Sequence, residues 1–239
     1  MHNTNAHILC TAPLEKSLIE KIRNEHIHVD AIPFISIEPI NDQTLFEKIN
    51  KLQTENINVV VTSSNAIDAI AKYIDNKPLN WKIFCIGEAT QKAVINFLGG
   101  QSIAGTAFDA ADLAKEILKH NEITKVVFFC GDMRRDELPT ILQKANVLVE
   151  EIVVYHTALT PQKVEKNYDA ILLFSPSAVE SFFSVNDIKP NTVFFAIGNT
   201  TAASIKKFTD NKIITSETPS KEQLINQLLF YYTQTTISN

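Results

Sequence analysis

The feature that most constrains the fold of this chain is a strand, hydroxyl turn and helix that occurs twice. Residues 59–70, "VVVTSSNAIDAI", run from β-branched residues into two serines and an amphipathic helix. Residues 171–182, "ILLFSPSAVESF", repeat this plan, with Ser175 standing 112 positions after Ser63. Self-similarity at this spacing indicates that the chain contains an internal duplication.

The match extends beyond these turns. Gly87 and Gly198 pair at an offset of 111, so a single deletion separates the two copies. In the other direction, "ILCTAP" at 8–13 resembles "FFCGDM" at 128–133, and "IPFI" resembles "VVYH" further along. Each half of the chain is therefore expected to carry five strands in the same order.

Strand-like and helix-like segments alternate almost throughout, which is typical of βαβ units and a mainly parallel α/β sheet. Strands are expected at residues 7–11, 28–35, 58–62, 82–86, 102–104, 125–130, 147–155, 169–174, 193–197 and 213–215. Apolar residues three and four apart predict helices at 14–25, 64–74, 88–98, 110–120, 135–145, 177–183, 200–208 and 221–232. Pro139 lies inside one of these helices, which is therefore expected to start late or bend.

Two segments, "DAIPFISIEPI" and "VEEIVVYHT", are extended, β-branched and longer than a typical strand of about 5 to 6 residues. We expect them to cross between two lobes. The first lobe is then discontinuous, with residues 1–35 plus 157–239, the second lobe is 41–150, and 36–40 with 151–156 form a hinge. A contiguous division near residue 120 is the alternative.

The net charge of -5 gives the chain no long-range attraction for nucleic acid or an anionic membrane, so neither is expected as a partner. No apolar run approaches the roughly 20 residues of a spanning helix, and the N-terminus lacks a signal-peptide pattern. We therefore expect a cytoplasmic protein. Cys10, Cys85 and Cys130 stand far apart in apolar runs without a Cys-x-x-Cys pair, which predicts buried, reduced thiols.

Conventional catalytic motifs are missing from the sequence. The histidines form no metal-spaced set with cysteine or carboxylate, so no metal site is expected. Neither the Gly-x-Ser-x-Gly elbow nor a phosphate-binding glycine fingerprint occurs. The sequence instead indicates a cleft that shapes a ligand and supplies few reactive groups.

The repeated hydroxyl turns are candidate binding sites, because ligands of parallel sheets bind at the carboxyl ends of strands, beside unpaired helix N–H groups. The first turn offers Thr62, Ser63, Ser64 and Asn65, and its twin offers Ser175, Pro176 and Ser177. Helix capping alone is the plainer interpretation of each residue. Because such turns recur in both lobes, we expect four positive helix ends to line one cleft and to favour carboxylates or phosphates.

Two glycine turns complete this set. Gly87 in "FCIGEAT" and Gly198 in "FAIGNTT" each end an apolar strand and precede a helix. Glycine there lets the backbone turn and lets a ligand approach closely. The hydroxyl residues after them are Thr90, Thr200 and Thr201, for which ligand contact and a plain first-turn role stay open.

The segment "CGDMRRDEL" places Gly131 and Arg135 at another strand-to-helix turn. An arginine can clamp a carboxylate with two parallel hydrogen bonds, although a solvated helix start paired with nearby acids is the alternative. Tyr155 lies on the returning strand, so its phenol can project into the cleft while its ring packs on the hinge. A purely structural tyrosine is the alternative there.

Six segments resemble, in order and over nearly the whole chain, the successive signatures of the uroporphyrinogen-III synthase family. They are "VVVTSSNAIDAI", "IFCIGEATQKAV", "GDMRRDELPTIL" followed by "EEIVVYHT", "ILLFSPSAVESFF", "FFAIGNTTAASI" and "ETPSKEQLINQL". Each segment is a weak signal alone, and the ordered set is fairly specific.

The resemblance implies two flavodoxin-like lobes joined by a two-stranded ladder, and a cofactor-free lyase of tetrapyrrole biosynthesis. Its substrate is the linear tetrapyrrole hydroxymethylbilane, which loses water and closes into a macrocycle, uroporphyrinogen III, with the last pyrrole ring, ring D, inverted. We expect a monomer that receives the bilane in a transient hand-over from hydroxymethylbilane synthase.

The resemblance also implies residue roles. In the family's proposed mechanism the hydroxyl departs to leave a conjugated cation, ring D is attacked at its substituted carbon, and a spiro intermediate fragments and recloses. Tyr155 matches a tyrosine proposed to hydrogen-bond the leaving hydroxyl. The first strand departs from the family's "TRP", because it reads "TAP" with Ala12. A carboxylate contact from an arginine there is either lost or taken over by Lys16 or Arg135.

A binding module is the rival class of function. A two-lobed α/β protein with a hinge can serve as a solute receptor or an allosteric sensor, which needs no catalysis. The missing signal-peptide pattern counts against a periplasmic receptor, and no DNA-binding segment is evident for a regulator. The isomer made from porphobilinogen by the chain and the preceding deaminase separates enzyme from receptor.

Overall fold

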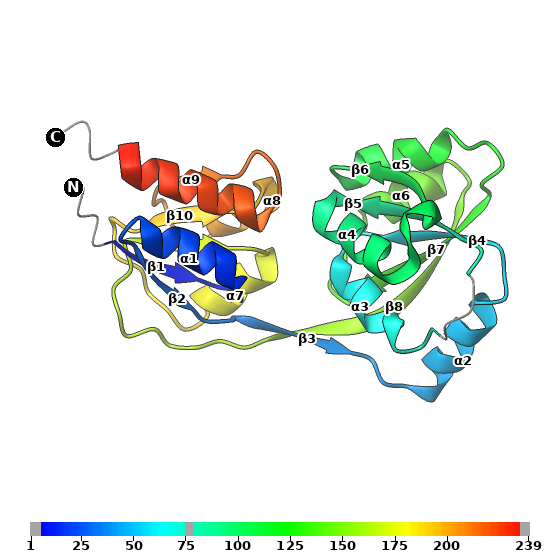
Figure 1. Cartoon of the computed structure of the whole chain (residues 1–239), viewed down its shortest axis with the longest axis horizontal. Coiled ribbons are helices and arrows are strands. Elements are labelled where there is room, and N and C mark those ends of the chain that lie inside the picture. Colours follow the sequence, from blue (N-terminus) through cyan, green and yellow to red (C-terminus); the bar gives the residue numbers. More distant parts are fainter. Residues whose placement is uncertain (1–5, 75–78, 235–239) are drawn as a thin grey trace. The chain divides into compact units, whose positions relative to one another are not determined.

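The computed structural model describes residues 6–74 and 79–234, and the chain divides into two compact units (Figure 1). Unit 1 consists of Met1–Ser36 and Ala158–Asn239, and unit 2 of Ile37–Thr157. The chain therefore passes from one unit to the other twice, within the strands β3 (Ile35–Pro39) and β8 (Leu148–Leu159).

Unit 1 contains a five-stranded parallel sheet in the order β11-β10-β9-β1-β2. Its strands are β1 (His7–Cys10), β2 (His28–Ala31), β9 (Ala170–Leu173), β10 (Val193–Ala196) and β11 (Ile213–Thr215). If these five strands are numbered 1 to 5 along the chain, they lie in the sheet in the order 2-1-3-4-5, starting from β2. This is the strand order of flavodoxin-like folds.

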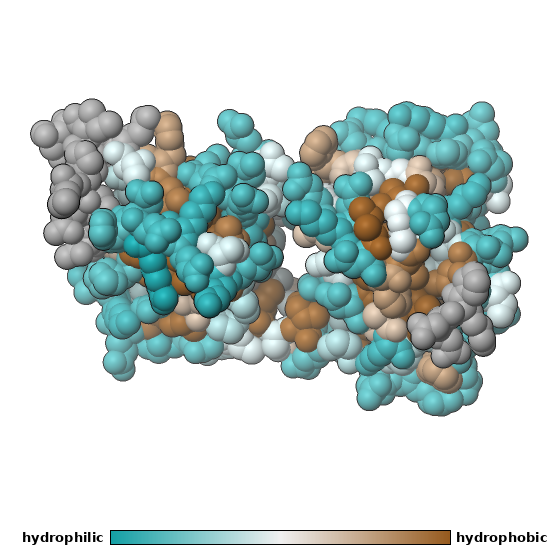
Figure 2. Space-filling view, in the orientation of Figure 1, coloured by the Kyte–Doolittle hydropathy of each residue, from teal (hydrophilic) through white to brown (hydrophobic). Residues whose placement is uncertain are grey.

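Helices cover both faces of this sheet (Figure 1). They are α1 (Lys16–Asn24), α7 (Pro176–Phe183), α8 (Asn199–Ile205) and α9 (Lys221–Gln234). Ile22 of α1 and Leu224 of α9 pack with Ile8, whereas Phe182 of α7 and Ile205 of α8 belong to the core on the other face. The outer surface of α1 is largely hydrophilic (Figure 2), as expected for a helix that buries one stripe.

Unit 2 contains a six-stranded sheet in the order β3-β8-β7-β4-β5-β6. Its further strands are β4 (Ile57–Val61), β5 (Trp81–Ile86), β6 (Ile103–Ala107) and β7 (Lys125–Gly131). The pairs from β8 to β6 are parallel. Ile40 N–H donates to the Val154 carbonyl at 3.0 Å and Thr160 N–H to the Phe34 carbonyl at 3.0 Å, so β3 and β8 run in opposite directions.

The helices of unit 2 also cover both faces of the sheet. They are α2 (Gln43–Leu52), α3 (Ser64–Ala71), α4 (Gly87–Leu98), α5 (Ala110–Leu118), α6 (Glu137–Lys144) and a 3-10 turn at Gly100–Ser102. Alternate residues of β4 show the division, because Val59 and Val61 pack with α3 while Val60 packs with α5.

The duplication is visible in the two strand orders. In unit 2 the order β8-β7-β4-β5-β6 corresponds, strand by strand in the sequence repeat, to β2-β1-β9-β10-β11 of unit 1. Each sheet therefore combines the first two strands of one repeat with the last three strands of the other. The predicted fold class, α/β with two parallel-sheet lobes that arise by duplication, is confirmed.

One strand predicted from the sequence is wrong in detail, and one helix was not named. The strand expected at 28–35 is two strands, because β2 pairs with β1 in unit 1 while β3 pairs with β8. Helix α2 was not predicted, although Asp42 caps it by accepting from Thr44 N–H at 3.1 Å. Other details are confirmed: α6 starts late enough to hold Pro139 in its first turn, and all three cysteines are buried free thiols.

From the sequence, the change of lobe is expected within residues 36–40 and 151–156. In the structure, the chain leaves unit 1 after Ser36 and enters unit 2 at Ile37. It leaves unit 2 after Thr157 and returns to unit 1 at Ala158. A hinge role for these strands remains a prediction. Across residues 6–74 and 79–234, no helix is long and apolar enough to cross a membrane.

Candidate active site

The side chain of Tyr155 extends from β8 over the end of β7 toward the end of β4, all in the sheet of unit 2. Tyr155 belongs to β8, and its hydroxyl lies near the side chains of Ser63 and Asn65, which follow β4. Strand β7 lies between β8 and β4, so the ring must pass over the end of β7. Gly131 ends β7, and a Cβ there would lie 2.4 Å from Cε2 of Tyr155. The missing side chain of Gly131 therefore lets the phenol reach Ser63.

Ser63 has two roles in this arrangement. It is the N-cap of α3, and its Oγ accepts a hydrogen bond from Asn65 N–H at 3.2 Å. The same hydroxyl lies beside the Tyr155 hydroxyl. Helix capping and phenol positioning are thus compatible functions of one serine. Thr62 and Ser64, also predicted, flank it and are half-buried.

Burial raises the pKa of Tyr155 above its ordinary value, and the hydrogen bond with Ser63 opposes this shift. Cys130 and Asp132 raise the pKa of Tyr155 further, whereas Asn65 lowers it. The phenol is therefore neutral at physiological pH and can donate its proton in a hydrogen bond. Burial also raises the pKa of Cys130, to about 11, so its thiol is protonated.

Asp132 and His156, which next follows Tyr155 in the chain, form a carboxylate–histidine pair that was not predicted from the sequence. His156 Nδ1 lies 2.9 Å from Asp132 Oδ2, and Thr157 N–H donates to Asp132 Oδ1 at 3.0 Å. Burial raises the pKa of Asp132, but the hydrogen bonds with His156 and Thr157 together bring it below the ordinary value. The signal in the sequence was that His156 directly follows Tyr155 on the crossing strand.

The two arginines after β7 differ in their surroundings. Arg134 is hydrogen-bonded to the carboxylates of Glu151 and Asp136. Arg134 therefore fits the alternative left open by the sequence, in which an arginine at the helix start pairs with nearby acids. Arg135, the predicted carboxylate ligand, is exposed in the same turn, between β7 and α6. It remains a candidate ligand.

The second turn of unit 2 lies at the start of α4. Gly87 has φ +76°, a conformation that favours glycine, and the space where its Cβ would lie is open. Thr90 stands in the first turn of this helix and is 4% exposed. Glycine is therefore required here for the backbone, as expected.

The corresponding turns of unit 1 follow β9 and β10. Ser175 is the N-cap of α7 and accepts from Ala178 N–H at 3.1 Å, with Pro176 and the half-buried Ser177 in the first turn. Gly198 precedes α8 with φ -176°, which any residue can adopt, so the expected backbone role of this glycine is not needed. The last two candidates differ in exposure, because Thr200 is exposed and Thr201 is 3% exposed.

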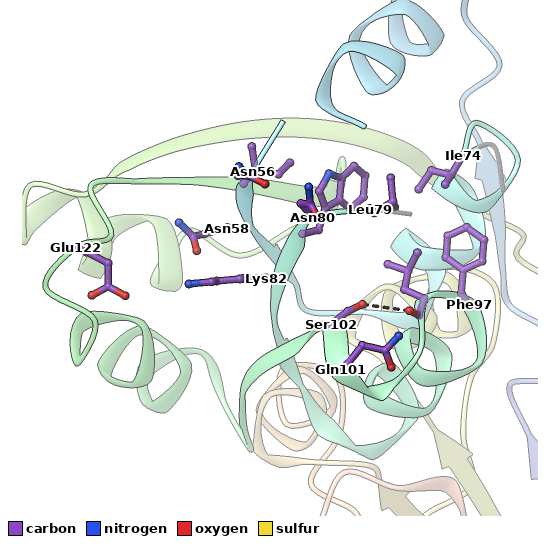
Figure 3. A pocket seen from close by; sticks show the side chains of 13 residues that line it. Asn56, Asn58, Ile74, Leu79, Asn80, Lys82, Phe97, Gln101, Ser102 and Glu122 are labelled. Atoms are coloured by element: carbon purple, nitrogen blue, oxygen red, sulfur yellow. Dashed lines mark hydrogen bonds between the residues drawn. The ribbon is translucent and has the colours of Figure 1, made fainter. Parts of the chain in front are cut away.

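A surface pocket of about 1030 Å³ lies at the other end of the strands in unit 2, away from the predicted site residues. It is lined by residues at the amino ends of β4 and β5, among them Asn58 and Lys82 (Figure 3). Its wall includes Ile74 and Leu79, which flank residues 75–78. This pocket includes none of the predicted site residues, which follow the carboxyl ends of the strands.

Within residues 6–74 and 79–234, no group of three or more histidine, cysteine or carboxylate side chains could hold a metal ion. Both expected replacements for an arginine at Ala12, Lys16 and Arg135, are exposed. The Lys16 side chain is 91% exposed, with its Nζ 3.8 Å from Glu20.

The family model for uroporphyrinogen-III synthase HemD matches residues 16–226. The chain belongs to the uroporphyrinogen-III synthase family. Two solved structures show the same fold over nearly the whole chain. One is a mutant uroporphyrinogen III synthase from the extremely thermophilic bacterium Thermus thermophilus (12% identity, TM-score 0.66, 96% of this chain and 99% of that chain covered). The other is the synthetase from Helicobacter pylori (18% identity, TM-score 0.66, 95% and 99% covered).

Membership of the uroporphyrinogen-III synthase family confirms the resemblance seen in the sequence motifs. The chain is a lyase of porphyrin and heme biosynthesis, and a tetrapyrrole is its substrate. Nothing in these matches supports the alternative of a two-lobed receptor without catalysis.

One exposed aromatic residue at the carboxyl ends of the strands was not among the predicted site residues. Phe108 directly follows the carboxyl end of β6 and is 73% exposed. Asp109, the next residue, caps α5 by accepting from Asp112 N–H at 2.8 Å. A bulky apolar residue in front of a polar helix cap was the signal in the sequence.

Proposed function

We propose that hydroxymethylbilane binds at the carboxyl ends of strands in both units and that Tyr155 donates a hydrogen bond to its leaving hydroxyl. The observation that carries this proposal is the position of the neutral Tyr155 phenol, which lies over Gly131 and near Ser63 and Asn65. A buried, neutral phenol is a hydrogen-bond donor and not an acceptor of protons at physiological pH.

The chemistry needs few reactive groups from the protein. The electron-rich pyrrole next to the hydroxymethyl group drives departure of the hydroxyl, and Tyr155 assists by hydrogen bonding to the departing oxygen. The resulting cation closes either directly or with ring D inverted. The protein must therefore hold the chain so that the substituted carbon of ring D, and not the free one, is attacked.

The substrate's acetate and propionate carboxylates require donors at the same strand ends. The helix starts after Ser63, Gly87, Ser175 and Gly198 each expose backbone N–H groups there. Exposed Arg135 adds a cation in unit 2. These local donors support carboxylate binding by a chain whose net charge is -5.

Tyr155→Phe tests the proposal, with porphobilinogen and hydroxymethylbilane synthase generating the substrate in a coupled assay. We expect the turnover of the variant to fall about 10-fold to 100-fold, because assistance by one acid is typically worth ~10² to 10⁴ and the pyrrole already expels the hydroxyl. The measurement is the rate of type III product after oxidation and separation of the porphyrin isomers. The lost fraction should appear as type I product from uncatalysed closure.

Tyr73→Phe is a matched control in the same unit. Tyr73 is 6% exposed and its hydroxyl donates to the Ile40 carbonyl, so the control also removes a buried phenol hydrogen bond. We expect it to leave turnover within about 2-fold. Full rate and pure type III product from Tyr155→Phe would make Tyr155 a packing residue. Loss of activity in Ser63→Ala or Thr201→Ala instead would show that the hydroxyl turns matter more.

We further propose that the enzyme acts as a cytoplasmic monomer that receives the bilane from hydroxymethylbilane synthase. Three buried free thiols, Cys10, Cys85 and Cys130, are consistent with a reducing compartment. Light scattering at assay concentrations tests the monomer. A trapping experiment, in which free hydroxymethylbilane dilutes the labelled intermediate, tests the hand-over.

A further inference from the structure

Lys221 stands at the carboxyl end of the unit 1 sheet, as the first residue of α9. Its Nζ donates to the carbonyl oxygen of Pro13 at 2.9 Å, and Pro13 lies three residues after the end of β1. The same Nζ lies 5.8 Å from the ring centroid of Phe174, the residue that follows β9. Because β1 and β9 are neighbours in the sheet, the ammonium is fixed over the ends of two adjacent strands.

The ammonium of Lys221 keeps donors for a further partner. An ammonium has three N–H groups, and the Pro13 carbonyl accepts from one of them. In the part of the chain that the structure describes, Lys221 forms no ion pair, whereas Lys166 pairs with Asp30 at 2.8 Å. A positive group with two unused donors is suited to an anion.

The positive charge of Lys221 is unfavourable for the stability of helix α9. A helix start carries partial positive charge and is stabilised by acidic residues, so a cation at the first residue of the 14-residue helix α9 is unfavourable there. The charge of Lys221 therefore does not stabilise the start of α9 through the helix dipole.

We propose that Lys221 binds one carboxylate of the linear tetrapyrrole. The carbonyl of Pro13 and the ring of Phe174 hold the ammonium in place, so little side-chain freedom is lost when the carboxylate arrives. This inference rests on the proposed function, because it takes the substrate to bind at the carboxyl ends of the strands. Lys221 binds and positions the substrate and takes no part in the bond changes.

Lys221→Met tests the inference in the full chain, with Lys212→Met as the matched control. Lys212 precedes β11 at the opposite edge of the same sheet, and its Nζ lies 4.5 Å from the ring centroid of Tyr231. Both variants therefore remove one positive charge and one cation–π contact from unit 1. We measure KM and kcat for hydroxymethylbilane, the salt dependence of KM, and the melting temperature.

We expect Lys221→Met to raise KM about 10-fold and to change kcat less than about 2-fold, since a charged hydrogen bond made equally in the ground and transition states is lost. Its KM should rise less steeply with salt than that of the natural enzyme. Its melting temperature should stay the same or increase, because an unfavourable charge leaves the helix start. Lys221→Arg should restore most of the affinity, and Lys212→Met should leave KM unchanged.

Three results would overturn the inference. In the first, KM is unaltered in Lys221→Met. In the second, both methionine variants raise KM equally, which would indicate a general charge effect. In the third, KM rises only together with a lower melting temperature. Failure of the proposed function is distinct, because the natural enzyme would then fail to form type III product or Tyr155→Phe would retain full rate.

Discussion

At the scale of single residues, the Tyr155 phenol depends on what Gly131 lacks. The ring occupies the space of a Gly131 side chain, with Cζ 2.5 Å from where a Cβ would lie, and the hydroxyl thereby reaches Ser63. The approach of the phenol to Ser63 requires both the tyrosine at position 155 and the missing side chain at position 131. A side chain at position 131 would therefore displace the Tyr155 ring.

Gly131→Ala should displace the Tyr155 ring, because a contact of 2.4 Å cannot persist. We expect turnover to fall into the range of Tyr155→Phe, about 10-fold to 100-fold, and stability to fall by ~1 to 3 kcal/mol, as overpacking typically costs. Coupled-assay rates and thermal unfolding measure the two effects. Adding Gly131→Ala to Tyr155→Phe should reduce turnover little further, since both act through one hydrogen bond.

Gly105→Ala is the control for crowding alone. Its Cβ would lie 2.8 Å from Cδ1 of Phe84, so it also crowds a buried ring in the unit 2 sheet. We expect a similar loss of stability with turnover within about 3-fold of the natural enzyme. An equal loss of turnover in the two alanine variants would mean that Gly131 acts through general stability and not through Tyr155.

At the scale of elements, the two glycine turns are equivalent in sequence but differ in conformation. Gly87 starts α4 with φ +76°, whereas Gly198 caps α8 with φ -176°. A Cβ on Gly87 would meet no atom within 4 Å, and one on Gly198 would meet only Pro219 at 4.0 Å. Both sites therefore have room for the Cβ of an alanine. Only Gly198 has a φ angle that alanine adopts without strain.

Gly87→Ala should destabilise the protein by ~1 to 2 kcal/mol, the cost of a left-handed backbone for a residue with a Cβ. Gly198→Ala should be neutral or stabilising by up to ~1 kcal/mol, because it reduces the freedom of the unfolded chain. Denaturant unfolding of both variants checks this difference. Reversal of the order would show that the glycines serve packing. A lower turnover in stable Gly198→Ala would support close approach of substrate.

At the scale of the whole molecule, each sheet unites strands from both halves of the chain. Unit 2 is continuous, from Ile37 to Thr157, and has its own core on both faces of its sheet. Unit 1 is interrupted by it, yet Thr160 N–H and the Phe34 carbonyl are 3.0 Å apart near the interruption. A short linker could therefore join the two parts of unit 1.

We expect residues 37–157, expressed alone, to unfold cooperatively, and residues 1–36 joined to 158–239 by a short Gly-Ser linker to do the same. Neither fragment should form type III product, because we propose that both units contact the substrate. Circular dichroism on heating and the coupled assay are the measurements. An unfolded 37–157 fragment would show that its sheet depends on unit 1, and an active single fragment would contradict two-unit binding.

Much of this structure could be predicted from local patterns. The hydrophobic periods placed most helices and strands within a few residues, and the serine turns placed two N-caps, at Ser63 and Ser175. Local patterns failed where pairing decided the outcome. Residues 28–35 form a single β-branched run in sequence but belong to two strands with different partners, which no local propensity reveals.

Residue types at short spacings, and their repetition, were enough to establish the duplication, the order of elements and the family. The packed structure was needed to learn which atoms meet. Tyr155 reaches Ser63 across β7, and Lys221 reaches Pro13 over the end of β1, between residues roughly 90 and 200 positions apart. Such approaches follow from sheet order and from space left by absent side chains, and these are properties of packing that a linear pattern does not contain.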